Sequence, residues 1–377
     1  MGQILLSVLL LCCRLWLVNI STPSTSVVGP EVPVTPELAH AAPGHSPRAP
    51  GLVPVATASE LGIPYDRYQV KDAFDRTVTF YVSVPGAGKP KDAPKAEASE
   101  DRPMPLALMV QGSGCASVFM KAPDGRIGGG LPNALIRSAK GRCRVVCVEK
   151  PGVNFLDNPQ PPGSGEPCTE EFKNEHAFNR WVGACEAAVA AASSLPGVDG
   201  SRILAAGHSE GGIIAAGVAA RNPRVTHVGV LANGGPTQLY DMTQFVRQPR
   251  SANDTPEECE KRVEQVYEAW ERIKADPDST SKTEWGHPYK RWFTFLSTST
   301  LDQLLKTDAR VFLAYGTADT SVPVTSCDAL RAELARHGKD VTCERVIGGD
   351  HGYRVESKPE FDGISFVFDA LVTWFLG

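Results

Sequence analysis

Residues 202–220 read RILAAGHSEGGIIAAGVAA, and the fold of the chain can be inferred outward from these residues. The apolar run RILAA is typical of a short buried strand, and GIIAAGVAA is compatible with a helix. Between them, Gly207 and Gly211 are small enough for the strand and the helix to approach closely. The stretch therefore predicts a strand, a sharp turn that presents Ser209, and a helix. The alternative is an ordinary strand-to-helix turn in which Ser209 caps the helix.

Strand-like and helix-like patterns alternate along the chain outward from this turn. We predict strands at 76–84, 106–111, 144–149, 202–206, 227–232, 310–315 and 342–347, and helices at 131–140, 170–194, 211–220, 326–337 and 364–375. The strand at 76–84 alternates as an exposed antiparallel strand does, whereas 106–111 is continuously apolar, as a buried parallel strand is. The alternation predicts an α/β fold with a mostly parallel central sheet and helices on both faces.

The alternation stops between about residues 236 and 306. This segment contains a charged helical pattern at 255–274, followed by Trp285, Tyr289, Trp292, Phe293 and Phe295. We expect it to form a cap, inserted between the late strands and lying over the edge of the sheet where ligands bind. Its aromatic side chains either form the core of the cap or line a substrate pocket.

Three residues with complementary chemistry each follow a predicted strand. They are Ser209, Asp319 in Gly-Thr-Ala-Asp, and His351 in Gly-Gly-Asp-His-Gly. A serine hydroxyl needs a base to accept its proton, and the imidazole needs a carboxylate that fixes its tautomer. We therefore predict Ser209 as the nucleophile, His351 as the general base and Asp319 as the carboxylate that orients the base. Asp350, the neighbour of His351, is the alternative carboxylate.

The other histidines are less suited to the role of the base. His227 lies near the start of a predicted strand and hence at the opposite edge of the sheet. His208 adjoins Ser209, but the side chains of neighbouring residues diverge. His176 falls in a predicted helix, where we expect it at the surface.

Backbone amides near Ser209 would stabilise negative charge on a substrate oxygen. One candidate is the N–H of Glu210 at the start of the following helix, and we assign no chemistry to its side chain. The second donor should come from the loop after the strand at 106–111, where Ser113 is the first choice and Gly114 the next. A phosphate-binding loop is the rival interpretation, but the sequence contains no G-x-x-x-x-G-K-[ST].

The N-terminal region is typical of a targeting segment followed by a spacer. Residues 1–20 include the apolar run ILLSVLLLCCRLWLVNI, which indicates a signal peptide or a short anchor. Residues 21–58 are rich in Pro, Ala, Ser and Thr, so we predict a disordered Pro-rich spacer before a domain at 59–377. We expect a secreted protein or one of the periplasm or cell envelope, with membrane contact only through an uncleaved N-terminal segment.

Eight cysteines follow the leader, and an even set in an exported protein indicates disulfides. We expect two, one joining Cys115 and Cys168 in loops on the active-site side and one joining Cys327 and Cys343. The alternative is that several of the eight are buried free thiols.

Charge and spacing exclude several classes of partner. The formal net charge is -5 and no basic stripe is present, so we expect no nucleic acid partner. Cys143 and Cys147 have no histidines at zinc-site spacing after them, so we expect no metal.

Residues 65–377 resemble the α/β-hydrolase superfamily, and in particular its dienelactone hydrolase and prolyl-oligopeptidase-like serine esterase branch. The resemblance rests on GHSEGG at 207–212, YGTADTSVP around Asp319 and GGDHGY around His351. It implies acyl transfer without a metal or organic cofactor. Dienelactone hydrolases themselves use a cysteine nucleophile, so Ser209 argues against that activity.

The chemistry of these residues predicts a serine hydrolase that cleaves carboxylic esters through an acyl-enzyme intermediate. Its substrate would be a small ester or acyl compound. The same groups cleave amides, so an exported aminopeptidase or acyl-peptide hydrolase is one alternative. A non-catalytic binding protein on a hydrolase scaffold is the other, since a fold alone does not establish function.

Overall fold

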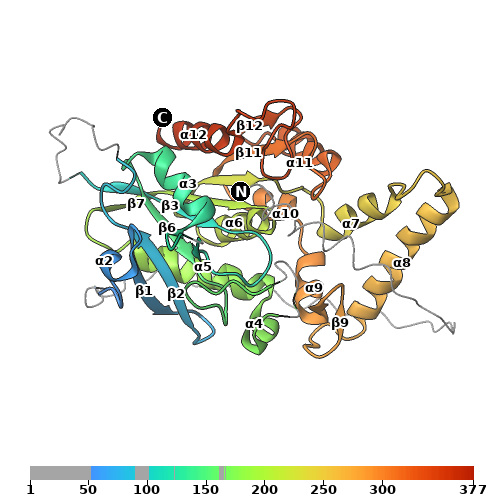
Figure 1. Ribbon diagram of the computed structural model, residues 1–377, viewed down its shortest axis with the longest axis horizontal. Helices are drawn as coiled ribbons and strands as arrows, with labels where there is room; N and C mark the ends of the chain where they lie inside the picture. The colour runs from blue at the N-terminus through green and yellow to red at the C-terminus, as the bar shows by residue number, and fades with distance from the viewer. Residues whose placement is uncertain (1–51, 90–101, 123, 161–164, 166) are drawn as a thin grey trace.

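The computed structural model describes residues 52–89, 102–122, 124–160, 165 and 167–377 (Figure 1). The predicted leader at 1–20 and most of the predicted spacer at 21–58 lie outside these residues. Within the described part of the chain, no helix combines the length and apolar character that crossing a membrane requires.

The fold is built on one eight-stranded sheet with the strand order β1-β2-β6-β3-β7-β8-β11-β12. Its strands are β1 (Tyr65–Lys71), β2 (Thr77–Ser83), β3 (Met104–Val110), β6 (Arg144–Val148), β7 (Val198–His208), β8 (Val225–Leu231), β11 (Arg310–Gly316) and β12 (Val341–Val346). Strand β2 pairs antiparallel with β1 and β6, whereas all neighbouring pairs from β6 to β12 are parallel. The mostly parallel sheet predicted from the sequence is confirmed.

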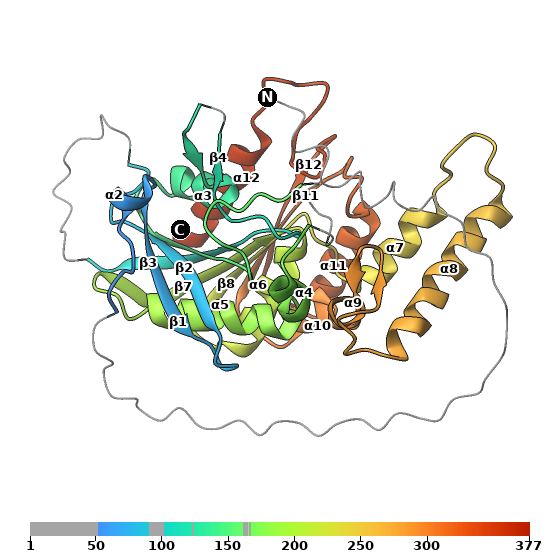
Figure 2. The same cartoon turned by 60° about the horizontal axis from the view of Figure 1, so that its bottom comes forward.

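Helices cover both faces of this sheet because successive side chains of a strand point to opposite sides. In β7, Ile203 and Ala205 pack on one face, whereas Leu204 and Ala206 pack on the other. The first face is covered by α5 (Phe178–Ala192), α6 (Glu210–Arg221), α10 (Thr300–Leu305) and α11 (Val324–Arg336), and the second by α3 (Gly130–Ala139) and α12 (Gly363–Leu376) (Figure 2). The sheet therefore has a buried apolar layer on each side.

The single helix predicted at 170–194 is wrong, because two helices occupy this segment. Helix α4 (Glu170–Glu175) begins at Thr169, whose side chain accepts a hydrogen bond from Phe172 N. It ends at His176, and Ala177 then adopts an extended conformation before α5 begins. The apolar spacing continues across the break, so the pattern alone could not reveal it.

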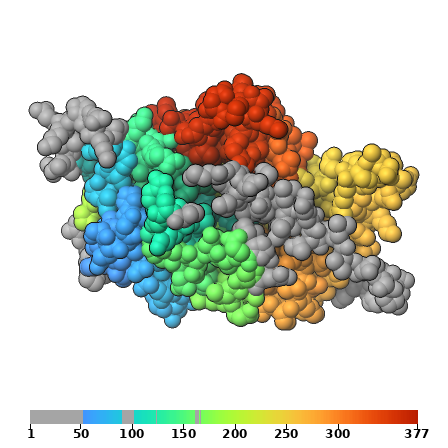
Figure 3. Space-filling view, viewed as in Figure 1, coloured from blue at the N-terminus to red at the C-terminus, as the bar shows by residue number. Residues whose placement is uncertain are grey.

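Between β8 and β11, several elements form a group at one end of the sheet (Figure 1). They are α7 (Gln238–Arg247), α8 (Pro256–Lys274), β9 (Thr283–Glu284), β10 (His287–Pro288) and α9 (Tyr289–Leu296). Ile273 of α8 packs against Tyr289, Trp292 and Leu296, so these two aromatic residues contribute to the core of the group. The group lies beside α4 (Figure 3), where Lys290 Nζ donates a hydrogen bond to Asn174 O at 2.7 Å.

One of the two predicted disulfides is present and the other is not. Cys115 and Cys168 are joined, with their Cα atoms 5.7 Å apart. Cys327 and Cys343 are free, so the second predicted pairing is wrong. Both border Tyr315 in one small cluster, but Cys327 Sγ is directed at the carbonyl oxygen of Asn233, 3.6 Å away. Cys327 and Cys343 thus lie in the same cluster, but their sulfur atoms do not meet.

Candidate active site

Ser209 lies in the sharp turn between β7 and α6. Its φ of 56° and ψ of -130° are unusual for a residue with a side chain, and such conformations cost about 1–3 kcal/mol. The surrounding backbone holds the turn, since Ser209 N donates to Leu231 O and Ser209 O accepts from Gly212 N, both at 2.8 Å. A Cβ at Gly207 would lie 1.9 Å from Gly211 O, so only glycine fits at position 207.

Asp319 and His351 meet at the same edge of the sheet as Ser209. They follow β11 and β12, just as Ser209 follows β7. His351 Nδ1 is 2.8 Å from Asp319 Oδ2. The other carboxylate oxygen, Oδ1, accepts the backbone N–H groups of Ser321 at 2.7 Å and Val322 at 3.0 Å. The carboxylate is therefore fixed from both sides and holds the imidazole by Nδ1.

The remaining nitrogen of His351 is available for proton transfer. Its Nε2 is buried and has no hydrogen-bond partner among the described residues. In the neutral tautomer that donates its Nδ1 proton to Asp319, Nε2 would carry the lone pair that accepts a proton. This is the state that the base of a serine nucleophile requires.

His208 connects the nucleophile turn to the His351 loop. Its ring lies edge-on to that of His351, with centroids 4.8 Å apart, and its Nε2 donates to the backbone oxygen of His351 at 2.9 Å. Burial, together with the neighbouring His351, lowers the pKa of His208 to about 3, so the ring is neutral at neutral pH. His208 thus fixes the backbone of the residue predicted to be the base.

The loop after β3 lies against the predicted nucleophile. A Cβ added to Gly112 would lie 3.3 Å from Ser209 Cβ and 3.7 Å from Ser209 Oγ. The next residue is Ser113, whose N–H makes no hydrogen bond with the described residues. Gly114 has a φ of 87°, which favours glycine. The predicted donors Ser113 and Gly114 are therefore on the loop that faces Ser209.

The predicted donor on the other side is the N–H of Glu210. Glu210 is the first residue of α6, and the N–H groups of a first helical turn have no acceptor within the helix. The helix dipole also places partial positive charge at this end. This amide directly follows Ser209, and the loop at Gly112 lies close to the same residue.

The side chain of Glu210, which we expected to have no role, is buried in a charged cluster. Its carboxylate forms an ion pair with Arg291 of α9, and its Oε1 is 3.2 Å from His176 Nε2. The side chains of Glu210 and Arg291 are each only 4% exposed. Burial acts to raise the pKa of Glu210, but the charges of Arg291 and Lys150 and the contact with His176 more than offset it and hold this pKa well below its usual range.

His176 is a correction to the sequence-based expectation. It was expected on a helix surface, but it is only 2% exposed and stacks on Phe172 with ring centroids 4.5 Å apart. The break between α4 and α5 directs its ring into the interior, toward Glu210. Burial lowers the pKa of His176 to about 4, so it is neutral at neutral pH.

Lys150 is the fourth member of the cluster, and no sequence motif pointed to it. It follows β6 directly after Glu149 and is 2% exposed. Burial lowers the pKa of Lys150 to about 7, although the negative charge of Glu210 opposes this shift. The sequence offers one signal: Glu149 and Lys150 are two consecutive charged residues that directly follow a buried strand, at the edge of the sheet where ligands bind.

The described residues contain no group of three or more His, Cys, Asp or Glu side chains that could hold a metal ion. The functional groups at this edge are instead a hydroxyl, an imidazole, a carboxylate and backbone amides. These are the groups of acyl-transfer chemistry.

A family model described as the alpha/beta hydrolase family matches residues 108–361. The protein therefore belongs to the α/β-hydrolase family, as the sequence resemblance indicated. No curated protein matches the sequence.

Several solved structures are similar to this chain. The acylaminoacyl peptidase of Pyrococcus horikoshii matches with a TM-score of 0.54 and 14% identity, over 83% of this chain and 41% of that chain. The puromycin-hydrolyzing peptidase of Mycobacterium tuberculosis matches with a TM-score of 0.50 and 15% identity, over 83% and 39%. Est1E of Butyrivibrio proteoclasticus matches with a TM-score of 0.49 and 17% identity, over 81% and 97%. The chain spans about two fifths of the length of the two peptidases.

Proposed function

We propose that this α/β hydrolase is a serine esterase that cleaves carboxylic esters through an acyl-enzyme intermediate. The observation that carries the proposal is the hydrogen bond between His351 and Asp319, which leaves Nε2 of the imidazole free. It lies at the edge of the sheet where the turn after β7 holds Ser209 in its unusual conformation. The cleavable substrate is a small ester or acyl compound.

In the proposed reaction, His351 Nε2 takes the proton of Ser209 Oγ as the oxygen attacks the ester carbonyl carbon. The backbone N–H groups of Glu210 and Ser113 hold the resulting oxyanion, each worth about 3 kcal/mol in the transition state. His351 then gives its proton to the leaving alcohol, and the acyl group remains on Ser209. A water molecule, deprotonated by the same imidazole, releases the acid and restores the hydroxyl.

A fluorophosphonate probe tests this function directly, because it reacts with activated serine hydroxyls. We expect the full chain to be labelled at Ser209 and to hydrolyse 4-nitrophenyl acetate. Ser209→Ala should lose both properties, with a free energy of unfolding within about 1 kcal/mol of the wild type. Ser201→Ala is the matched control, since this exposed serine lies on the same strand and its side chain makes a hydrogen bond with Asp199.

Two outcomes would contradict the proposal. A folded wild-type protein that is neither labelled nor active would favour a non-catalytic binding protein. Labelling at Ser209 with faster cleavage of an aminoacyl 4-nitroanilide than of the ester would favour a peptidase that uses the same groups.

We also propose that the protein works in an oxidising compartment outside the cytoplasm. The support is the buried Cys115–Cys168 disulfide, because such bonds are rare where thiols are kept reduced. Mass spectrometry of the protein, unfolded and alkylated without reduction, should find this pair unmodified. Alkylation of both cysteines would contradict the proposal.

A further inference from the structure

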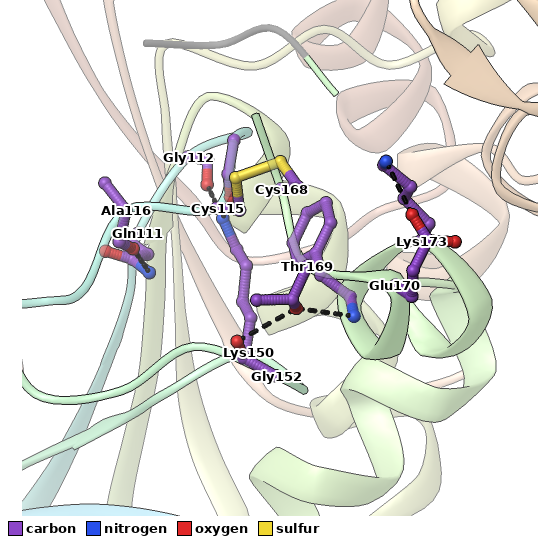
Figure 4. The surroundings of a disulfide bond; sticks show 12 residues. Gln111, Gly112, Cys115, Ala116, Lys150, Gly152, Cys168, Thr169, Glu170 and Lys173 are labelled. Atoms are coloured by element: carbon purple, nitrogen blue, oxygen red, sulfur yellow. Dashed lines mark hydrogen bonds and ion pairs between the residues drawn. A yellow bond between two sulfur atoms is a disulfide. The ribbon is translucent and has the colours of Figure 1, made fainter. Parts of the chain in front are cut away.

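The loop predicted to supply an oxyanion donor is held by a buried lysine. Lys150 extends from the end of β6 toward this loop (Figure 4). Its Nζ donates hydrogen bonds to Gly112 O at 2.5 Å and to Gly114 O at 2.6 Å. One ammonium group thus fixes the two peptide planes that lie on either side of the Ser113–Gly114 bond.

These two hydrogen bonds determine where the amide N–H groups of the loop point. In a trans peptide, the C=O and the N–H are directed to opposite sides. Because Gly112 O is directed at Lys150, the N–H of Ser113 in the same peptide is directed away from Lys150. Gly112 itself lies close to Ser209, because a Cβ added at Gly112 would lie 3.3 Å from Ser209 Cβ.

The ammonium group is itself held in place by its surroundings. It lies over the ring of Trp181, 4.5 Å from the centroid, and the negative charge of Glu210 stabilises its protonated form. Glu210 is also the residue whose N–H is the other predicted donor. Lys150 therefore makes hydrogen bonds with the loop on one side of the predicted oxyanion site. On the other side it is attracted electrostatically to the Glu210 carboxylate.

The disulfide restrains the same loop at its far end. Cys115 follows Gly114 directly and is joined to Cys168, just before α4 (Figure 4). Thr169 Oγ1 in turn donates to Gly152 O at 3.0 Å, close to Lys150 in the chain. The loop is thus restrained at Gly112, Gly114 and Cys115.

We propose that Lys150 is a positioning residue that aims the Ser113 N–H into the oxyanion site by holding Gly112 O and Gly114 O. The proposal rests on the serine hydrolase function proposed above. Lys150 does not contact the reacting atoms, and it acts through the backbone of the loop. Its loss should therefore weaken transition-state binding far more than substrate binding.

The test compares Lys150→Met, which keeps an unbranched side chain one atom shorter and has no donor, with the wild-type full chain. We expect kcat on 4-nitrophenyl acetate to fall about 100-fold while KM changes by less than about threefold. The inhibition constant of a trifluoromethyl ketone, whose adduct with Ser209 places an oxyanion in the site, should rise by about the same factor as kcat falls. Lys339→Met is the matched control, because Lys339 also donates to a backbone carbonyl, that of Thr307, at 2.7 Å.

Lys150→Arg is the conservative variant and the safeguard if Lys150→Met does not fold. It retains the cation and its donors, but the longer side chain places a planar guanidinium where the compact ammonium was, so the two carbonyl oxygens of the loop must shift to meet it. We expect its kcat to lie about tenfold below that of the wild type, at unchanged KM.

A folded Lys150→Met or Lys150→Arg protein with a kcat within about threefold of the wild type would overturn the proposal. A rise in KM without loss of kcat would also overturn it, since that indicates a role in ground-state binding. A wild-type protein that is not labelled at Ser209 would instead remove the proposed function, and this is measured separately.

Discussion

Removing the negative charge of Glu210 should destabilise the protein strongly. Glu210 follows the predicted nucleophile, yet we expect its side chain to act on stability. The carboxylate is the only negative group in contact with Arg291 among the described residues, and both side chains are 4% exposed. Breaking a buried pair by removing one partner costs about 3–5 kcal/mol, because the other charge is left without compensation. Here Glu210→Gln leaves the buried Arg291 without a partner of opposite charge, so we expect a loss of about 3–5 kcal/mol.

The magnitude is best isolated with a double-mutant cycle of Glu210→Gln, Arg291→Met and the double variant. Removal of both partners no longer leaves Arg291 unpaired, so the double variant should lose less than the sum of the single losses, by about 2–3 kcal/mol. Urea unfolding followed by circular dichroism and tryptophan fluorescence measures these free energies. Urea is preferred to guanidinium chloride because it does not screen charge.

The exposed pair Arg247–Glu260 provides the matched control. Its side chains are 41% and 58% exposed, so Glu260→Gln should change the free energy of unfolding by less than about 1 kcal/mol. The reasoning would be refuted if Glu210→Gln cost as little as Glu260→Gln. Additive single losses would refute it too, because they would show that Glu210 and Arg291 are not energetically coupled.

Three other predictions concern the disulfide, the predicted base and pH. Replacing Cys115 and Cys168 by serine should lower the free energy of unfolding by about 4 kcal/mol at 25 °C, from a sequence separation of 53, and a loss below about 1 kcal/mol in urea unfolding would argue against this. Asp319→Asn should lower kcat about 10⁴-fold with an unchanged circular dichroism spectrum, because the amide oxygen stays on the two backbone N–H groups and its NH₂ forces the His351 proton onto Nε2. Retained kcat would show that Asp319 does not set the tautomer. Burial raises the pKa of Asp241 from 3.8 to about 7, so its contribution to stability is present below pH 4 and is lost as the pH rises through 7. Relative to Asp241→Asn, the wild type should therefore lose about 4 kcal/mol between pH 4 and pH 8, and parallel stability curves for the two proteins would contradict the shifted pKa.

What could be predicted from the sequence depends on local patterns. The run at 202–220 contains a strand, a turn and a helix within one stretch, and the conformation of each part depends mainly on its own residues. Asp319 and His351 could be chosen because each follows a strand, and strands of a parallel sheet end at a common edge. The structure places both side chains at that edge and within hydrogen-bond distance of each other. Their catalytic role remains a prediction.

The features that could not be predicted depend on contacts between segments that are distant in the sequence. The charged cluster joins Lys150, His176, Glu210 and Arg291, which come from the end of β6, the break between α4 and α5, the start of α6, and α9. The partners of a buried charge are set by packing in three dimensions, and no spacing in the chain encodes them. For the same reason, the sequence could place Cys327 and Cys343 in neighbouring elements but could not show that the two sulfur atoms stay apart.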